Sequence, residues 1–232
     1  MVEKYKPTVI SINELGKEIP TQVLAKSLFS YDIFKATGTN PHGGAVLAIE
    51  KQLKGVPIDC QQKPNIIAAS MLVNNKHITI TSVYSPLTQE LQLEHMSTIL
   101  KISPVNIIVG DFNAKSSIGG CPQGNKKGHE LESWIKKNKL NILNFGMITS
   151  LRSRTTIDLI ISSENELTTH CQQLPYNGSD HTPIFAEFNN INITHHQNFI
   201  HKVNWNLFQI VLCVLGSEID NYDESSSTHP FD

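Results

Sequence analysis

The chain has 232 residues, enough for one large domain with a sizeable hydrophobic core. Its composition, 39% hydrophobic and 17% charged residues, is typical of a globular protein, and the net charge of −2 argues against a strongly basic nucleic-acid-binding protein while leaving room for a local basic strip. No apolar run has the length of a membrane span, and the charges in MVEKYKPTVI do not fit a signal peptide. The four cysteines form no CxxC pair, which disfavours a zinc site and favours reduced thiols in an intracellular compartment.

Short apolar runs recur along the chain and predict β-strands. They cover residues 8–12, 45–49, 66–73, 77–84, 105–110, 156–162 and 182–188. Helical spacing of apolar residues predicts two helices, at 89–101 and 128–140. Strand pairs with a few helices between them favour an α+β sandwich over a regular βαβ series. We expect a single domain over 1–190, and over 191–232 a linker, a short helix and a disordered acidic tail.

The stretch NIIVGDFN at 106–113 ends an apolar strand in a carboxylate and a carboxamide. On an extended chain Asp111 and Asn113 share one face and Phe112 takes the other. Two polar groups at the end of a core strand need a polar partner, which a metal, a water or a phosphate could supply. The alternative is an Asx turn that closes the strand.

Further polar residues stand at strand ends or within apolar runs. Each has a structural alternative, such as a turn acid, a rim phenol or a surface histidine. Together they favour a site, because ligand-binding and catalytic groups gather where loops leave a rigid scaffold. They are Glu14, Tyr84, Asp158, Asp180 and His181.

Several of these stretches resemble a known family. GDFNA at 110–114, TIDLIIS at 156–162 and SDHTPI at 179–184 resemble the endonuclease/exonuclease/phosphatase superfamily, in this order. KPTVISINE at 6–14, HGGAVLAI at 42–49, VYSP at 83–86 and GNKKGHELESWIKKNKLNILN at 124–144 are similar to the apurinic-type endonuclease domain of non-LTR retrotransposons. The resemblance implies a DNase-I-like fold, a two-sheet β-sandwich flanked by helices. VNWNLF at 203–208 resembles the segment that leads to a reverse transcriptase in such elements.

The resemblance also implies a metal-dependent cleavage of DNA. Glu14 would bind the metal, for which Mg²⁺ is the first choice and Mn²⁺ a substitute. Asp180 would help to bind the metal or act on the surroundings of the catalytic histidine, His181. Asp111 would take a proton from the attacking water or orient that water, and Asn113 would hydrogen-bond the water or the phosphate. Tyr84 would donate its hydroxyl to the phosphate. His181 would stabilise the phosphate charge, oriented by Asp158. Candidate contacts to DNA phosphates, each of which could equally be a solvated surface charge, are Lys126, Lys127, Arg152 and Arg154.

The family pattern begins with a strand that carries an asparagine, and here KPTVI almost directly follows Met1. We therefore expect an N-terminally shortened copy of such an element that lacks the first strand and the reverse transcriptase domain. The leading hypothesis is an endonuclease that nicks target DNA in the nucleus. The alternatives are a catalytically impaired remnant and a phosphatase of the same superfamily, which would use the same residues.

Overall fold

The structure is a computed structural model that describes residues 2–15, 19–59, 63–164, 167, 169–191 and 193. These residues lie in the first of two compact units, which spans 1–194. The second unit, 195–232, lies outside the described residues, as do the helix and the acidic tail that the sequence predicts there. The domain boundary near residue 190 therefore stays a prediction.

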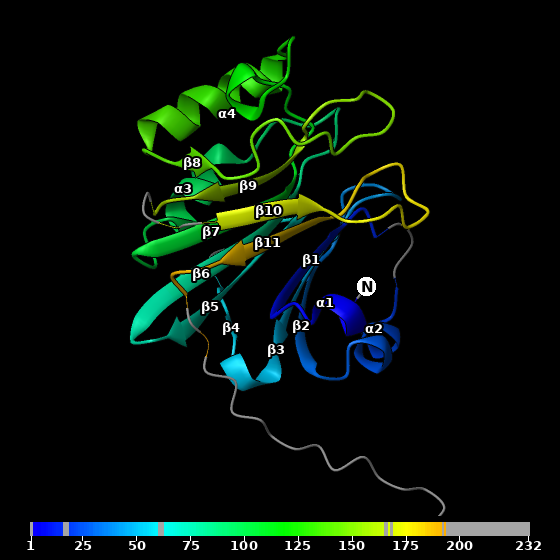
Figure 1. Ribbon diagram of the computed structural model, residues 1–232, viewed down its shortest axis with the longest axis vertical. Coiled ribbons are helices and arrows are strands. Elements are labelled where there is room, and N and C mark those ends of the chain that lie inside the picture. The colour runs from blue at the N-terminus through cyan, green and yellow to red at the C-terminus, as the bar shows by residue number, and fades with distance from the viewer. Residues whose placement is uncertain are drawn as a thin grey trace, which may run out of the picture. The chain divides into compact units, whose positions relative to one another are not determined.

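A six-stranded mixed sheet forms the centre of the first unit (Figure 1), with the strand order β4-β5-β6-β7-β9-β8. Strands β6 and β7 run parallel, and their other neighbours in the sheet are antiparallel. The strands are β4 (Val56–Pro57), β5 (Ile66–Val73), β6 (Lys76–Tyr84), β7 (Val105–Asp111), β8 (Asn141–Ile142) and β9 (Asp158–Ser162).

Two smaller antiparallel sheets form the second layer. One has the order β1-β3-β2 and the other pairs β10 with β11. Both contribute to a shared core with the large sheet, in which Leu47 and Ile49 meet Ile80 and Ile107 while Phe188 packs against them. The strands are β1 (Val9–Asn13), β2 (Tyr31–Ala36), β3 (Ala45–Glu50), β10 (Thr169–Gln173) and β11 (Ile184–Phe188). This layering is the predicted two-sheet sandwich.

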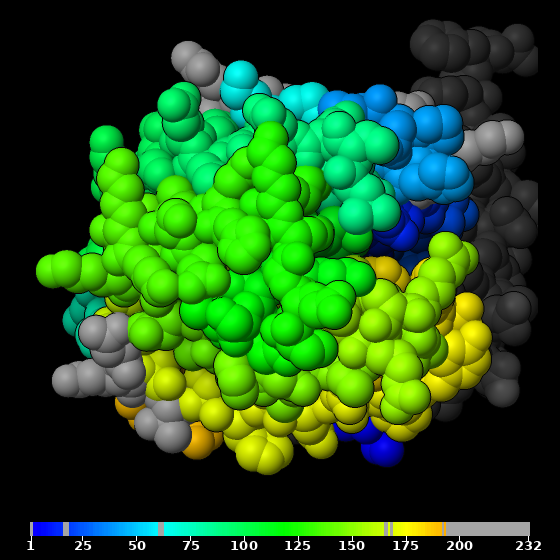
Figure 2. Space-filling view, turned by 90° about the horizontal axis from the view of Figure 1, so that it is seen from above, coloured from blue at the N-terminus to red at the C-terminus, as the bar shows by residue number. Residues whose placement is uncertain are grey.

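Helices cover the other face of the large sheet. The helices α3 (Leu93–Ile99) and α4 (Lys126–Lys137) correspond to the two predicted ones, and Figure 2 looks down on the side that α4 and its flanking segments cover. Met96, Leu131 and Trp134 pack there against Ile108 and other strand residues in a second core. The remaining helical segments are α1 (Val2–Tyr5), α2 (Thr21–Ser27), η1 (Lys51–Leu53) and η2 (Ser117–Gly119). None of the described helices is long and apolar enough to cross a membrane.

Candidate active site

Three polar side chains end three neighbouring strands in one row. Tyr84 pairs with Asp111 in the parallel ladder of β6 and β7, and Asp111 pairs with Asp158 in the antiparallel ladder of β7 and β9. Because β9 runs opposite to β7, the first residue of β9 lies at the same edge as the last residue of β7. Strand register alone therefore brings together three residues that are far apart in the sequence.

The glycine before Asp111 permits a close approach between β6 and β7. Gly110 has φ +145°, and a Cβ atom there would lie 1.8 Å from the carbonyl oxygen of Val83. Only glycine fits such a position. On the other side of Asp111, Phe112 is fully buried in the core beneath the helices. The buried ring fixes the strand end, and with it the carboxylate of Asp111.

Asp111 and Asn113 form the Asx turn that the sequence left open. Strand β7 ends at Asp111, whose Oδ1 accepts the backbone N–H of Asn113 at 2.8 Å and whose Oδ2 accepts its side-chain amide at 2.8 Å. Asn113 has φ +49°, a left-handed conformation that asparagine tolerates better than most residues. The chain is thus not extended here as the shared-face argument assumed, and the turn itself brings the amide to the carboxylate.

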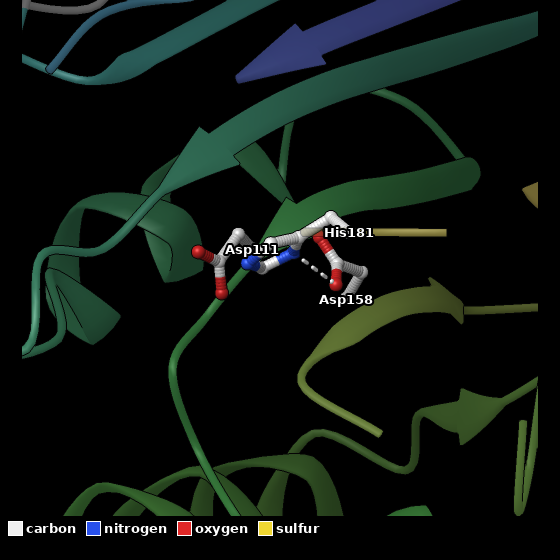
Figure 3. Close-up of side chains that lie close together, drawn as sticks. All are labelled: Asp111, Asp158 and His181. Carbon is white, nitrogen blue, oxygen red and sulfur yellow. Dashed lines mark hydrogen bonds and ion pairs between the residues drawn. The ribbon is translucent and has the colours of Figure 1, made fainter. Parts of the chain in front are cut away.

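His181 lies between two carboxylates. Its Nδ1 is 2.8 Å from Oδ2 of Asp158, and Figure 3 shows the imidazole between Asp158 and Asp111. Potential ligand atoms of Asp111, Asp158 and His181 all lie within 4.8 Å of one another. An antiparallel bridge to Ser150 holds the backbone of His181 in place. The bond at Nδ1 leaves Nε2 as the nitrogen available for a substrate.

The pKa values in this cluster depart from their ordinary values. Burial first, and then the neighbouring charge of Asp158, raise the pKa of Asp111 to about 7, although the hydrogen bond from Asn113 and the charge of His181 act against this rise. The hydrogen bond to Asp158 raises the pKa of His181 to about 9, against the opposing effect of burial. At neutral pH His181 is therefore a cation, and Asp111 exchanges its proton near that pH.

The polar side chains at this sheet edge, Tyr84, Asp111, Asp158 and His181, form what we call the rim. Glu14 joins the rim through a hydrogen bond from Tyr84. The phenol of Tyr84 is buried, and its pKa is raised first by that burial and then by a hydrogen bond to the Glu14 carboxylate. The hydroxyl thus stays protonated and donates to Glu14. The predicted site residues Glu14, Tyr84, Asp111, Asn113, Asp158 and His181 therefore converge on one edge of the sandwich, and their chemical roles stay predictions.

Asp180 lies beside this cluster and pairs with Arg152. The Nε of Arg152 is 3.2 Å from Oδ2 of Asp180, and the Asp180 carbonyl accepts the N–H of Leu151. The carboxylate of Asp180 still contributes to the raised pKa of His181. Through these two contacts Asp180 stabilises the turn between Ser150 and Thr155. It does not belong to the group of potential metal ligands formed by Asp111, Asp158 and His181.

The basic candidates differ in exposure. Arg152 and Arg154 are exposed on the turn next to His181. Lys126 is exposed at the start of α4, and its Nζ lies 3.8 Å from Oε1 of Glu90 and 3.7 Å from Oε1 of Glu130. Lys127 is buried and its ammonium binds protein oxygens, which removes it from the surface charges expected to contact DNA.

One residue behind the rim was not predicted. Asn65 is fully buried, and its side chain accepts the N–H of Gly44 at 2.7 Å and donates to the hydroxyl of Thr39 at 3.0 Å. Its backbone carbonyl accepts the N–H of Tyr84 at 2.8 Å. Asn65 thereby joins the loop before β3 to the strand end that carries Tyr84. The sequence carries no motif for this role, because the contacts are made across the fold.

The donor set fits a hard divalent cation. Glu14, Asp111 and Asp158 bring three carboxylates to a rim where His181 supplies the positive charge, and the charges of Asp158 and Glu14 add to the effect of burial in raising the pKa of Asp111. Carboxylate oxygens are the ligands that Mg²⁺ and Mn²⁺ prefer. Glu14 stays the predicted ligand and accepts the hydroxyl of Tyr84, while Asn113 donates to both oxygens of Asp111 and His181 bonds one oxygen of Asp158.

The sandwich has the DNase-I-like fold of the endonuclease/exonuclease/phosphatase superfamily. Solved structures with the same fold include an endonuclease domain and a 3′ phosphatase. The endonuclease domain of TRAS1, a telomere-specific non-LTR retrotransposon, is similar with a TM-score of 0.68 and 20% identity over 81% of this chain and 88% of that chain. The 3′ phosphatase NExo from Neisseria, solved with a product DNA hairpin, is similar with a TM-score of 0.59 and 15% identity over 81% of this chain and 91% of that chain.

Residues 78–185 match the family model described as endonuclease-reverse transcriptase. A search of curated proteins gives no match. The matched segment contains Tyr84, Asp111, Asp158 and His181, that is, the row at the sheet edge and the histidine bonded to it. The resemblance to this superfamily and to the endonuclease domain of non-LTR retrotransposons, expected from GDFNA and SDHTPI, is thus confirmed.

Proposed function

We propose that this protein is a divalent-metal-dependent endonuclease that nicks duplex DNA in the nucleus, so that a retroelement can prime reverse transcription at the nick. The observation that carries this proposal is the cluster of Asp111, Asp158 and His181 at one sheet edge, with Tyr84 and Glu14 beside it. The match of residues 78–185 to an endonuclease-reverse transcriptase family supports the same reaction.

The residues divide the work of phosphodiester hydrolysis. Asp111, with a pKa near neutrality, accepts a proton from the attacking water, and Asn113 holds the carboxylate in place. The imidazolium of His181 donates to a phosphate oxygen through Nε2 while Asp158 fixes its ring. Tyr84 keeps its proton and holds Glu14. A metal ion bound at Glu14 would offset the negative charge of the phosphate.

The test is a nicking assay on supercoiled plasmid with Mg²⁺, Mn²⁺ or EDTA. We expect conversion to open circles with either metal and none with EDTA, and nicks that carry a 3′-hydroxyl able to prime a polymerase. His170→Ala serves as a matched control for His181→Ala, because His170 lies exposed on β10. Intact plasmid under all conditions would contradict the proposal and support a catalytically impaired remnant.

A phosphatase of the same superfamily is the second candidate, supported by the likeness to the Neisseria 3′ phosphatase. The same side chains would suit it, because the phosphate chemistry is shared. An oligonucleotide with a 3′-phosphate separates the two activities. Release of inorganic phosphate with the plasmid left intact would favour the phosphatase, whereas nicking without release would favour the endonuclease.

A further inference from the structure

Lys127 is a buried cation next to the proposed active site. It lies in the first turn of α4 with 8% of its surface exposed. Its Nζ donates to the hydroxyl of Ser85 at 2.7 Å, to the carbonyl of Ser85 at 3.2 Å and to the carbonyl of Pro86. All three acceptors belong to the segment that directly follows Tyr84.

This segment is tied to the strand end that carries Asp111. The N–H of Ser85 donates to the carbonyl of Asp111 at 2.8 Å, and the carbonyl of Ser85 also accepts the side-chain amide of Asn113 at 3.2 Å. Lys127 and Asn113 thus share one acceptor. A shift of Lys127 would release a group that also orients Asn113, which in turn holds the carboxylate of Asp111.

The same turn of α4 holds the other side of the rim. Asn125 donates to the carbonyl of Asn113 at 3.0 Å and accepts the N–H of Lys115 at 3.0 Å and that of Gly128 at 2.7 Å. A Cβ on Gly128 would lie 1.6 Å from the carbonyl oxygen of Lys115, so the helix can approach this segment only with glycine there. Asn125, Lys127 and Gly128 form what we call the rim clamp.

We propose that Lys127 is a positioning residue, which through the rim clamp keeps segment 84–86 and segment 111–115 at the spacing that phosphodiester cleavage requires. This inference rests on the proposed function. A purely stabilising role fits the observations less well, because a buried ammonium carries a desolvation cost that an apolar side chain avoids. Burial indeed lowers the pKa of Lys127 to about 8. A phosphate contact fits less well too, since the ammonium faces protein carbonyls.

Kinetics of three variants separate these roles. Lys127→Met keeps most of the length of the side chain without its charge, Lys127→Arg restores donors, and Lys137→Met is a control on the exposed face of the same helix. For Lys127→Met we expect kcat for nicking to fall by roughly 10- to 100-fold, as small misplacements do, with KM and its salt dependence unchanged. Lys127→Arg should recover most of the rate, and Lys137→Met should match the wild type.

An unchanged kcat in Lys127→Met, or a raised KM with a weaker salt dependence, would overturn the inference; the second outcome would identify a phosphate contact. If Lys127→Met does not fold, Ser85→Ala removes one acceptor from the opposite side of the same contact. It should lower kcat by a few-fold at constant KM, and an unchanged kcat would again overturn the inference.

Amide hydrogen exchange tests the clamp without any activity. In Lys127→Met we expect faster exchange at residues 84–87 and 113–115, while the second half of α4 keeps its protection. If the wild type fails to nick DNA, the proposed function fails while this measurement still reports on the clamp. Unchanged exchange in both segments would show that Lys127 does not hold them.

Discussion

Asp111 and Asp158 face each other in the ladder of β7 and β9, with the imidazole of His181 between their carboxylates. The carboxylate of Asp111 is buried, and that of Asp158 forms a hydrogen bond with His181 at 2.8 Å. The two acids therefore differ in their effect. Asp158 sets the charge and the orientation of His181, while Asp111 itself takes up a proton near neutral pH.

Replacing His181 removes the donor proposed to face the phosphate. We expect His181→Ala to lower kcat for plasmid nicking by roughly 10²- to 10³-fold, the usual effect of losing one donor to a developing charge. The fold should persist, because the side chain is partly exposed. Nicking rates of His181→Ala and of His170→Ala, measured side by side, check this; equal rates would exclude His181 from the reaction.

The pH profile should reflect both groups. Asp111 must be ionised to accept a proton, so activity should rise as the pH passes about 7. His181 must be protonated to donate, so activity should fall above about 9. Asp158→Asn removes the main cause of the raised histidine pKa, and the alkaline limb should move to lower pH. An alkaline limb of kcat/KM that stays in place in this variant would contradict the assignment.

The same shifts predict how stability varies with pH. The pKa of His181 is higher in the folded chain than its ordinary 6.5, so its stabilisation is complete below pH 6.5 and is lost as the pH rises through about 9. The raised pKa of Asp111 acts in the same direction between about 4 and 7, because burying the ionised form costs free energy. Urea unfolding at pH 6 and 9.5 should show a smaller difference in His181→Ala than in the wild type. An equal difference in both proteins would argue against the Asp158–His181 pair.

Gly110 offers a test of the close approach between β6 and β7. A methyl group there would meet the Val83 carbonyl, so Gly110→Ala should lower the free energy of unfolding by about 3 kcal/mol or more. Gly146→Ala is the control, since Gly146 also has a positive φ but no atom lies within 4 Å of its Cβ position. That variant should lose only about 1–2 kcal/mol, the cost of the left-handed backbone. Equal losses in urea unfolding would contradict the predicted clash.

Arg154 tests the predicted DNA contact on the turn beside His181. If it neutralises one phosphate, Arg154→Gln should weaken binding to all duplexes alike and reduce the salt slope by about one. Lys139→Gln is a matched control, because Lys139 is also exposed with a positive φ but follows the far end of α4. Fluorescence anisotropy on a labelled duplex across a salt series checks this, and an unchanged slope would exclude the contact.

Much of the site was predictable because Tyr84, Asp111 and Asp158 interrupt apolar runs at strand ends, and register then aligns them. The strand β2 (Tyr31–Ala36) escaped prediction because charged residues break its apolar pattern, and β10 (Thr169–Gln173) because it is mostly polar. Lys127 was wrongly predicted to be a surface charge and Asn65 was not predicted at all, for a related reason. Their partners are backbone groups of distant segments, which no local pattern reveals.

The sheet edge that holds Asp111 is the proposed site of metal-dependent phosphodiester cleavage. The most direct measurement compares the wild type with Asp111→Asn in nicking of supercoiled plasmid with Mg²⁺, after circular dichroism has shown that both are folded. We predict open circles with the wild type and a rate lower by roughly 10²-fold or more with Asp111→Asn. Equal nicking by both folded proteins, or intact plasmid with the wild type, would contradict the account.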